Sequence, residues 1–312
     1  MSSASPPDDS SPSRSSSDVF LQLLANGVVT GSIYAIAAVG VSLIYGILRL
    51  VNFAYGDMMA FGALIAFGVN STWHQSMIVA ALVAMLATAA LSVALDLVLW
   101  RPLRKRRAGF MSLFLASIGL ALVLRQSLLL AAGPQPNAYR INPFRVFVLG
   151  SVRLSEAQVI AVITGAVAIL LVGVFLATTT VGRTLRAMAD DRTLAAIAGI
   201  DVARVTQLAW IISGLLAGLG GVLAGLVEYS FDPNFGFQLL LPVFAAVVLG
   251  GIGSAYGALA GGLVLGVVQE LSTWSGFAGG VDPVYKPVVA FGVLAIALLI
   301  RPQGFFGRAR VA

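Results

Sequence analysis

Residues 242–266 (PVFAAVVLGGIGSAYGALAGGLVLG) form an almost purely apolar stretch whose middle is interrupted by glycines and one serine. The stretch is long enough to cross a bilayer as one helix, since about 20 residues suffice. Each glycine in a helix interior, however, destabilises the helix by about 1 kcal/mol relative to alanine. We therefore predict two shorter helices joined at residues 250–254, a break of the kind that transport proteins place beside their substrate site.

Backbone at this break can lie at membrane depth only if it is buried in protein or lines a watery cavity, because an unpaired peptide group facing lipid costs several kcal/mol. Gly250, Gly251, Gly253 and Ser254 are therefore candidates for the translocation pathway. The glycines of residues 253–266 also recur at about four-residue spacing, which permits close approach of helices. For any single glycine, a packing role alone is the alternative.

The composition excludes a soluble globular domain. Of the 312 residues, 59% are hydrophobic and 10% are charged, whereas soluble domains contain about 45–50% apolar residues. The chain is therefore predicted to be an all-α integral membrane protein, a polytopic helical bundle. It has no cysteine and one histidine, His74, which excludes disulfides, thiolate metal sites and histidine-cluster chemistry. We expect no catalytic residue, no metal and no cofactor.

Residues 1–18 are rich in serine and proline and contain too little apolar surface to order themselves. They are predicted to be a disordered tail, followed by one membrane domain over residues 19–312. Eight or nine crossings are expected. The first apolar segment is compatible with one tilted helix or with a helix and a re-entrant piece. The predicted segments are residues 19–48, 53–69, 77–99, 110–132, 157–178, 206–227, 238–250, 255–268 and 284–300.

The net charge of +6 is interpreted as a topology signal, because Lys and Arg concentrate in cytoplasmic loops. No nucleic-acid partner is expected. Two basic loops and the C-terminus are placed in the cytoplasm, and the loop of residues 133–156 then lies outside although it carries three arginines. The charge rule assigns no side to the N-terminus. The residues that set this orientation are Arg101, Arg104, Lys105, Arg106, Arg107, Arg183, Arg186, Arg192, Arg204, Arg301, Arg308 and Arg310.

Asp57 lies in an otherwise apolar sequence, LRLVNFAYGDMMAFG. A charge at membrane depth costs at least about 2.5 kcal/mol and usually faces the bundle interior, a partner charge or a watery path. Asp57, with the nearby Asn52 and Tyr55, is therefore a candidate for the translocation pathway. The alternative is a structural ion pair between Asp57 and Arg49 at the membrane surface. Arg125 and Gln126, in the fourth predicted segment, are further candidates by a similar argument.

The second basic loop, residues 182–205 (GRTLRAMADDRTLAAIAGIDVARV), mixes four arginines with three aspartates and small residues. Its pattern predicts one or two short amphipathic helices that end at Gly199. A helix lying on the membrane surface is one interpretation. The mixed charges favour instead a helix that docks to a protein partner through its small residues. The candidate residues are Arg186, Asp190, Asp191, Arg192, Ala195, Ala196 and Gly199.

Four blocks of the sequence resemble the branched-chain amino-acid permease family of the LivH type. They are NGVVTGSIYAIAAVGVSLIYGI, VNFAYGD, RAMADDRTLAAIAGID and AAVVLGGIGSAYGALAGGLVLG, at residues 26–47, 51–57, 186–201 and 245–266. The third block also resembles the coupling loop of ABC importer permeases. It lacks the Glu-Ala-Ala opening of the general importer motif, so any acidic role there falls to Asp190 or Asp191.

The resemblance implies the permease subunit of an importer for branched-chain amino acids in the bacterial inner membrane. It implies a second homologous permease chain, two cytoplasmic ATP-binding subunits and an extracytoplasmic substrate-binding protein as partners. The chain contains no GxxxxGK[ST] phosphate loop, so ATP must be hydrolysed by another subunit. Urea, short amides or another amino acid are alternative substrates. From other classes, the rivals are an ion-driven secondary transporter with Asp57 as its coupling carboxylate, and a less favoured intramembrane enzyme.

Overall fold

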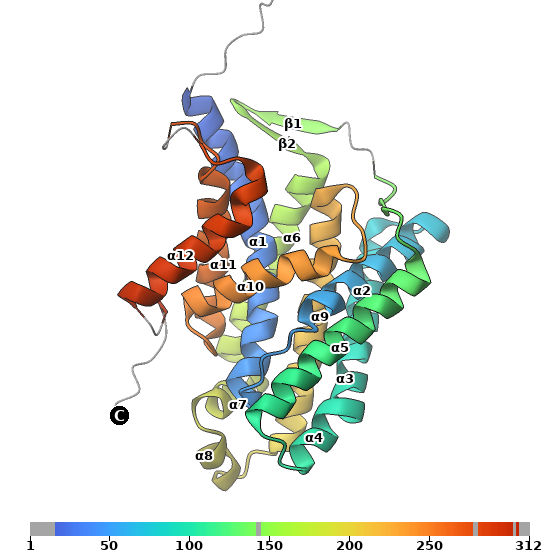
Figure 1. Ribbon diagram of the computed structural model, residues 1–312, viewed down its shortest axis with the longest axis vertical. Helices are drawn as coiled ribbons and strands as arrows, with labels where there is room; N and C mark the ends of the chain where they lie inside the picture. Colours follow the sequence, from blue (N-terminus) through green and yellow to red (C-terminus); the bar gives the residue numbers. More distant parts are fainter. Residues whose placement is uncertain (1–15, 142–144, 277–279, 302–303, 306–312) are drawn as a thin grey trace, which may run out of the picture.

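The computed structural model describes residues 16–141, 145–276, 280–301 and 304–305 (Figure 1). The helices are α1 (Ser16–Leu48), α2 (Tyr55–Phe67), α3 (Met77–Leu95), α4 (Arg101–Lys105), α5 (Phe110–Ala132), α6 (Glu156–Thr178), α7 (Thr180–Asp190), α8 (Arg192–Ile197), α9 (Val202–Glu228), α10 (Phe235–Gly250), α11 (Ala255–Leu271) and α12 (Lys286–Ile300). Strands β1 (Val146–Leu149) and β2 (Val152–Ser155) form an antiparallel hairpin that the sequence did not predict. Short π-helical turns, Gly68–Thr72 and Asp96–Trp100, follow α2 and α3.

Six helical segments of the described chain are long and apolar enough to cross a membrane. They are Ser16–Leu48, Met77–Lys105, Phe110–Ala132, Glu156–Thr178, Val202–Glu228 and Pro283–Ile300. Helices α10 and α11 are apolar but shorter, and α2 has 13 residues. The chain is therefore a polytopic helical membrane protein, as predicted, while the count of eight or nine crossings stays a prediction.

Helix α1 is one continuous helix, so of the two interpretations of the first apolar segment the single helix is correct. Its 33 residues span about 50 Å, more than the hydrocarbon core of a bilayer, which is about 30 Å thick. The helix begins at Ser16, so residues 16–18 of the predicted tail are helical. Residues 1–15 lie outside the described part of the chain.

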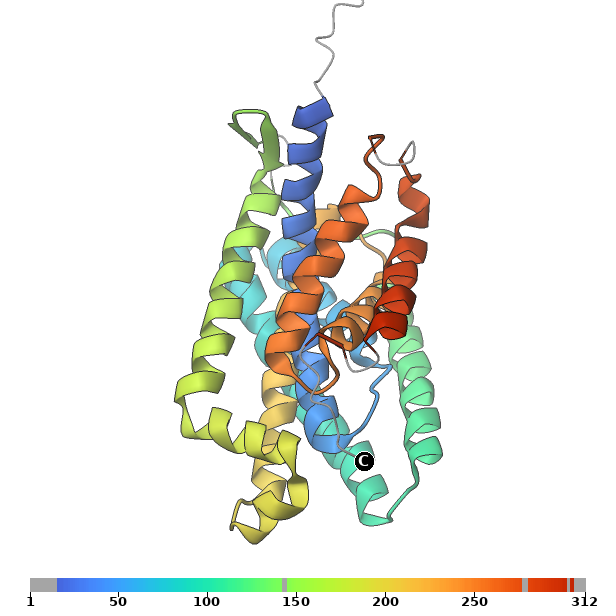
Figure 2. The same ribbon diagram turned by 90° about the vertical axis from the view of Figure 1, so that its left-hand side faces the viewer.

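Glycines bring α1 and α11 together at the centre of the bundle, where the two helices run side by side (Figure 2). A Cβ atom at Gly266 would overlap the backbone of Gly31, and one at Gly262 would overlap the backbone of Ala35. The absent side chains let the two backbones approach closely. The close approach predicted from the glycine spacing is thus confirmed for this helix pair.

The two basic loops lie at the same end of the bundle. Helix α4 and the pair α7 and α8 occupy this end, while the β hairpin and the start of α1 occupy the opposite end (Figure 1). The start of the first helix, which the charge rule did not place, is therefore on the side opposite to the basic loops. Arg308 and Arg310 of the predicted cytoplasmic tail lie outside the described residues.

Candidate functional site

The glycine-rich stretch breaks where it was predicted to break. Helix α10 ends at Gly250, and α11 begins at Ala255. Between them Gly251 has φ +102° and Gly253 has φ +89°, a left-handed backbone that favours glycine because it has no Cβ atom. Ser254 then caps α11, since its Oγ accepts a hydrogen bond from the Gly257 amide at 3.1 Å.

The break is packed tightly against its own helices. A Cβ atom at Gly250 would overlap the backbone of Gly257, and one at Gly261 would overlap the Ala246 carbonyl oxygen. Helices α10 and α11 are therefore in close backbone contact on either side of the turn that joins them. The chain after α12 returns to this turn, where the Phe305 amide donates a 2.9 Å hydrogen bond to the carbonyl oxygen of Leu249. This bond satisfies one of the carbonyl groups that the end of a helix leaves unpaired.

Gly251→Leu is expected to abolish substrate uptake, because a leucine at φ +102° forces the buried turn to rearrange. Insertion should persist, since the flanking apolar helices are unchanged. Uptake by cells and the amount of the chain in isolated membranes measure the two effects. Gly119→Leu is the control, because a side chain at Gly119 in α5 meets no protein atom within 4 Å. Normal uptake by Gly251→Leu would contradict a functional role of the turn.

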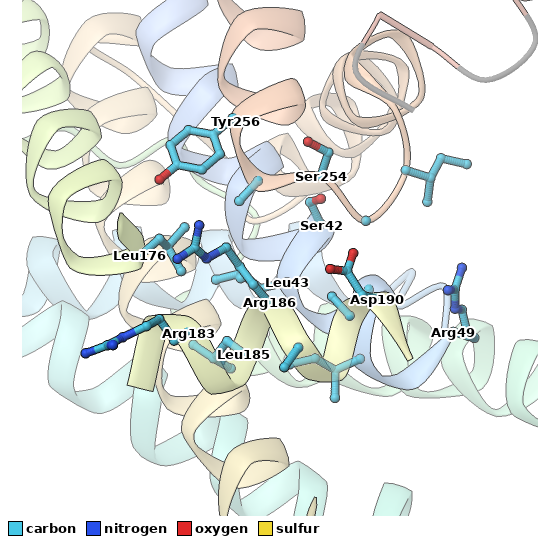
Figure 3. A pocket seen from close by; sticks show the side chains of 17 residues that line it. Ser42, Leu43, Arg49, Leu176, Arg183, Leu185, Arg186, Asp190, Ser254 and Tyr256 are labelled. Carbon is cyan, nitrogen blue, oxygen red and sulfur yellow. The ribbon is translucent and has the colours of Figure 1, made fainter. Parts of the chain in front are cut away.

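A cavity of about 710 Å³ lies beside the break, at the end of the bundle that carries the basic loops (Figure 3). Its walls come from the last turns of α1, from α7, from the end of α6 and from the start of α11. Gly253 and Ser254 of the break face it, together with residues that the sequence did not single out, Ser42 and Tyr256. The cavity therefore joins the break in the membrane helices to the predicted docking loop.

Asp57 forms its ion pair with Arg125 of α5, not with Arg49. The Arg125 Nε atom lies 3.1 Å from Asp57 Oδ1, the side chain of Asp57 is 1% exposed, and the guanidinium also lies over the Phe237 ring at 4.3 Å from its centroid. The alternative prediction of an Asp57–Arg49 ion pair is wrong. Helix α2 lies inside the bundle, so Asp57 meets Arg125 of α5 there. Arg49 stays exposed at the end of α1, where it faces the cavity.

Asn52 and Tyr55, like Asp57, are buried inside the bundle. The Asn52 Oδ1 atom accepts a hydrogen bond from the Ala54 amide, which shapes the turn before α2. The Tyr55 hydroxyl donates to the Ser213 carbonyl oxygen of α9 at 3.5 Å. Of these predicted pathway residues, all within the described part of the chain, Gly253 and Ser254 line the cavity, whereas Asn52, Tyr55 and Asp57 do not. The predicted pathway residues therefore form two groups.

The predicted docking loop forms two helices, α7 and α8, joined at Asp191. The Asp191 side chain caps α8 by accepting hydrogen bonds from the amides of Thr193 and Leu194. After α8, Gly199 has φ +85°, and the chain turns toward α9. The sequence therefore predicted the end of the short helix at Gly199, whereas the start of α8 at the Asp191 cap was not predicted.

The exposed face of α8 differs from the expected one. Ala195, predicted to be at the centre of the docking contact, is 4% exposed and packs against its own chain. Leu194 and Ile197, which the sequence analysis did not choose, are 65% and 78% exposed. They lie three residues apart, so they share a face of the helix. An apolar pair flanked by charges signals such a face, but the helical register that exposes it depends on the packing of α8 against α7 and α9.

The amino-acid sequence matches one family of known proteins over most of its length. Residues 23–298 match the model of the family described as branched-chain amino acid transport system / permease component. The chain is 32% identical to the high-affinity branched-chain amino acid transport system permease protein LivH of Salmonella typhimurium, over 94% of this chain and 97% of LivH. It is also 32% identical to the permease protein BraD of Pseudomonas aeruginosa, with the same coverage.

Among solved structures, the chain is similar to PsaBC from Streptococcus pneumoniae in complex with Fab, with a TM-score of 0.49 and 16% sequence identity over 92% of this chain and 94% of that one. The family model and the two permeases each cover far more than half of the sequence. The chain therefore belongs to the branched-chain amino acid transport system permease family.

Proposed function

We propose that this permease, together with a second homologous permease chain, forms the membrane channel of an ABC importer for branched-chain amino acids. Two cytoplasmic ATP-binding subunits drive the cycle, and an extracytoplasmic binding protein delivers the substrate. The observation that carries the proposal is the match to the permease family and to LivH over almost the whole chain. The absence of a phosphate-loop motif from the sequence fits a subunit that relies on another chain for ATP.

The orientation follows from the arrangement of the basic loops. Helices α4, α7 and α8 lie at one end of the bundle, and Lys and Arg concentrate on the cytoplasmic side of membrane proteins. We propose that this end lies in the cytoplasm of the bacterial cell, and that the C-terminus, which carries further arginines, lies there as well. Helices α10 and α11 form a re-entrant or broken membrane segment, and Gly250, Gly251, Gly253 and Ser254 contribute to the pathway beside it.

The docking surface for an ATP-binding subunit is the exposed face of α8. Leu194, Ala196 and Ile197 supply its apolar part, and exposed large apolar side chains at a polar end of a membrane protein mark a partner contact. Gly199 ends the helix close to this face. Its charged rim consists of Asp191 and Arg192. Arg186 and Asp190, the other charged candidates of the loop, line the cavity between α7 and α1.

The rival from another class, an ion-driven transporter with Asp57 as coupling carboxylate, is disfavoured by the ion pair of that residue. Asp57 is buried and held by the guanidinium of Arg125. A carboxylate that binds and releases a coupling ion in each cycle needs access to water, and a fixed counter-charge competes with that ion. The ion pair therefore argues against ion coupling through Asp57.

The function is tested by co-expressing the chain with its second permease, its ATP-binding subunits and its binding protein, and measuring uptake in proteoliposomes. Radiolabelled leucine should accumulate only when ATP is enclosed with the ATP-binding subunits. Unlabelled isoleucine and valine should compete with it, whereas urea and acetamide should not. Uptake that is driven by an ion gradient without ATP, or that transports urea in preference to leucine, would contradict the proposal.

A further inference from the structure

The cavity beside the break contains a buried hydroxyl group without a partner. Ser42 of α1 is 0% exposed, and among the described residues its Oγ atom has no hydrogen-bond partner. A buried polar group left unpaired costs about 1–3 kcal/mol. Ser42 lies near Ser254, the residue of the break that caps α11, and both line the cavity (Figure 3). A polar ligand that reaches this point therefore gains a hydrogen bond that the described residues leave unmade.

The cavity also presents opposite charges on one helix. Arg186 and Asp190 of α7 lie four residues apart, so about 5–6 Å separates their Cβ atoms on one face of the helix. Both side chains extend from α7 toward α1 and α11, with the Asp190 carboxylate closest to Ser42 and Ser254 (Figure 3). Arg183, one turn earlier, extends its guanidinium away from these serines. The cavity thus holds a carboxylate near the unpaired hydroxyl and a guanidinium that extends toward Leu176 and Tyr256.

Aliphatic side chains complete the wall of the cavity. Leu43 and Ile47 of α1 and Leu176 of α6 lie beside the charged pair, and Ile252 of the break adds a fourth. A space of about 710 Å³ is ample for a molecule of a few heavy atoms, since small-molecule pockets usually measure about 300–1,000 Å³. The cavity therefore combines one positive group, one negative group, a hydroxyl and an apolar wall.

We propose that this cavity binds the zwitterion of an aliphatic α-amino acid on the cytoplasmic side of the permease. The guanidinium of Arg186 receives the carboxylate, and the carboxylate of Asp190 receives the ammonium group. The Ser42 hydroxyl bonds the same charged end, and the aliphatic wall holds the side chain. The proposal rests on the proposed function, because it identifies the cavity as the site that the imported molecule occupies before its release.

The site is tested by chemical protection, which the absence of native cysteine makes possible. Ala187→Cys places a thiol on the cavity wall. The assembled importer is incorporated in inside-out vesicles without ATP, and the rate of alkylation by N-ethylmaleimide is measured. Millimolar leucine should slow this rate several-fold. Leucinamide, which lacks the carboxylate, and 4-methylpentanoate, which lacks the ammonium group, should not. Lys105→Cys, exposed on α4 outside the cavity, is the control whose rate leucine should not change.

Further variants identify the groups responsible. Combined with Ala187→Cys, Arg186→Gln and Asp190→Asn should each raise the leucine concentration needed for protection at least tenfold, and Ser42→Ala should raise it less. Arg183→Gln, which removes a guanidinium that points away from Ser42, should retain protection. Equal protection by leucine and both analogues, or protection by none of them, would overturn the site.

Leucine uptake by the same importer separates this inference from the proposed function. Uptake of leucine without protection would overturn the cavity site and leave the function standing. Protection without uptake would support the site and reject the proposed substrate. The absence of both would reject both proposals.

Discussion

Arg125→Met alone is expected to destabilise the permease strongly, because it leaves the Asp57 carboxylate buried without its counter-charge. Asp57 is 1% exposed, and removal of one partner from a buried ion pair costs about 3–5 kcal/mol. For a chain of this size, such a loss lowers the melting temperature by roughly 10 °C. Thermal unfolding of the purified complex in detergent measures the shift, and uptake should fall in parallel.

The double variant Asp57→Leu/Arg125→Met distinguishes a structural role of the pair from a role in transport. Replacing both charges by apolar residues of similar volume is usually neutral or stabilising, so the melting temperature should recover. If uptake recovers as well, the pair only holds α5 against α2. If stability returns without uptake, Asp57 belongs to the pathway. Arg49→Gln is the matched control, because Arg49 is exposed and unpaired with Asp57, and it should leave the melting temperature unchanged.

Ile197→Asp is expected to uncouple the importer, since it places a charge at the more exposed of the two large apolar residues of α8. Residues at the centre of an interface contribute 2 kcal/mol or more to binding, which corresponds to a loss of affinity of about thirtyfold. Uptake should therefore be lost, while ATP hydrolysis persists without transport or the ATP-binding subunits dissociate. Ala196→Trp, also on the exposed surface, should have the same effect. Uptake, ATPase activity and co-purification of the subunits measure these outcomes.

Two controls confine this effect to the docking surface. Arg192→Ala removes a charge from the rim and should reduce uptake much less, because truncation at a rim is usually tolerated. Ala196→Cys should form a cross-link to an ATP-binding subunit, whereas a cysteine at the buried Ala195 should not. If thiols on α8 react only with reagents added from outside the cell, the assignment of the loop to the cytoplasm is wrong.

Local chemistry in the sequence determined the class of the protein, the break and the two helices of the docking loop. The apolar composition alone excludes a soluble domain. The break could be predicted because its turn needs positive φ angles at Gly251 and Gly253, and glycine adopts such angles without strain. Asp191 and Gly199 delimit α8 by capping geometry, which involves only neighbouring residues. Each of these features depends on interactions within a few residues along the chain.

Tertiary packing alone decided which distant groups meet. Asp57 is separated from Arg125 by 68 positions in the sequence, whereas Arg49 is close to it. Only the packing of α2 inside the bundle determines that Arg125, and not Arg49, is the ion-pair partner of Asp57. The cavity is built from α1, α6, α7 and α11. Nothing in the sequence around Ser42 indicates that this residue lines a cavity, or that its buried hydroxyl has no hydrogen-bond partner among the described residues. Ala195, expected at the docking contact, is buried, and Ile197, for which the sequence predicted no role, is exposed. The contacts of α8 with α7 and α9 decide this, because small residues fit equally well on either face of a short helix.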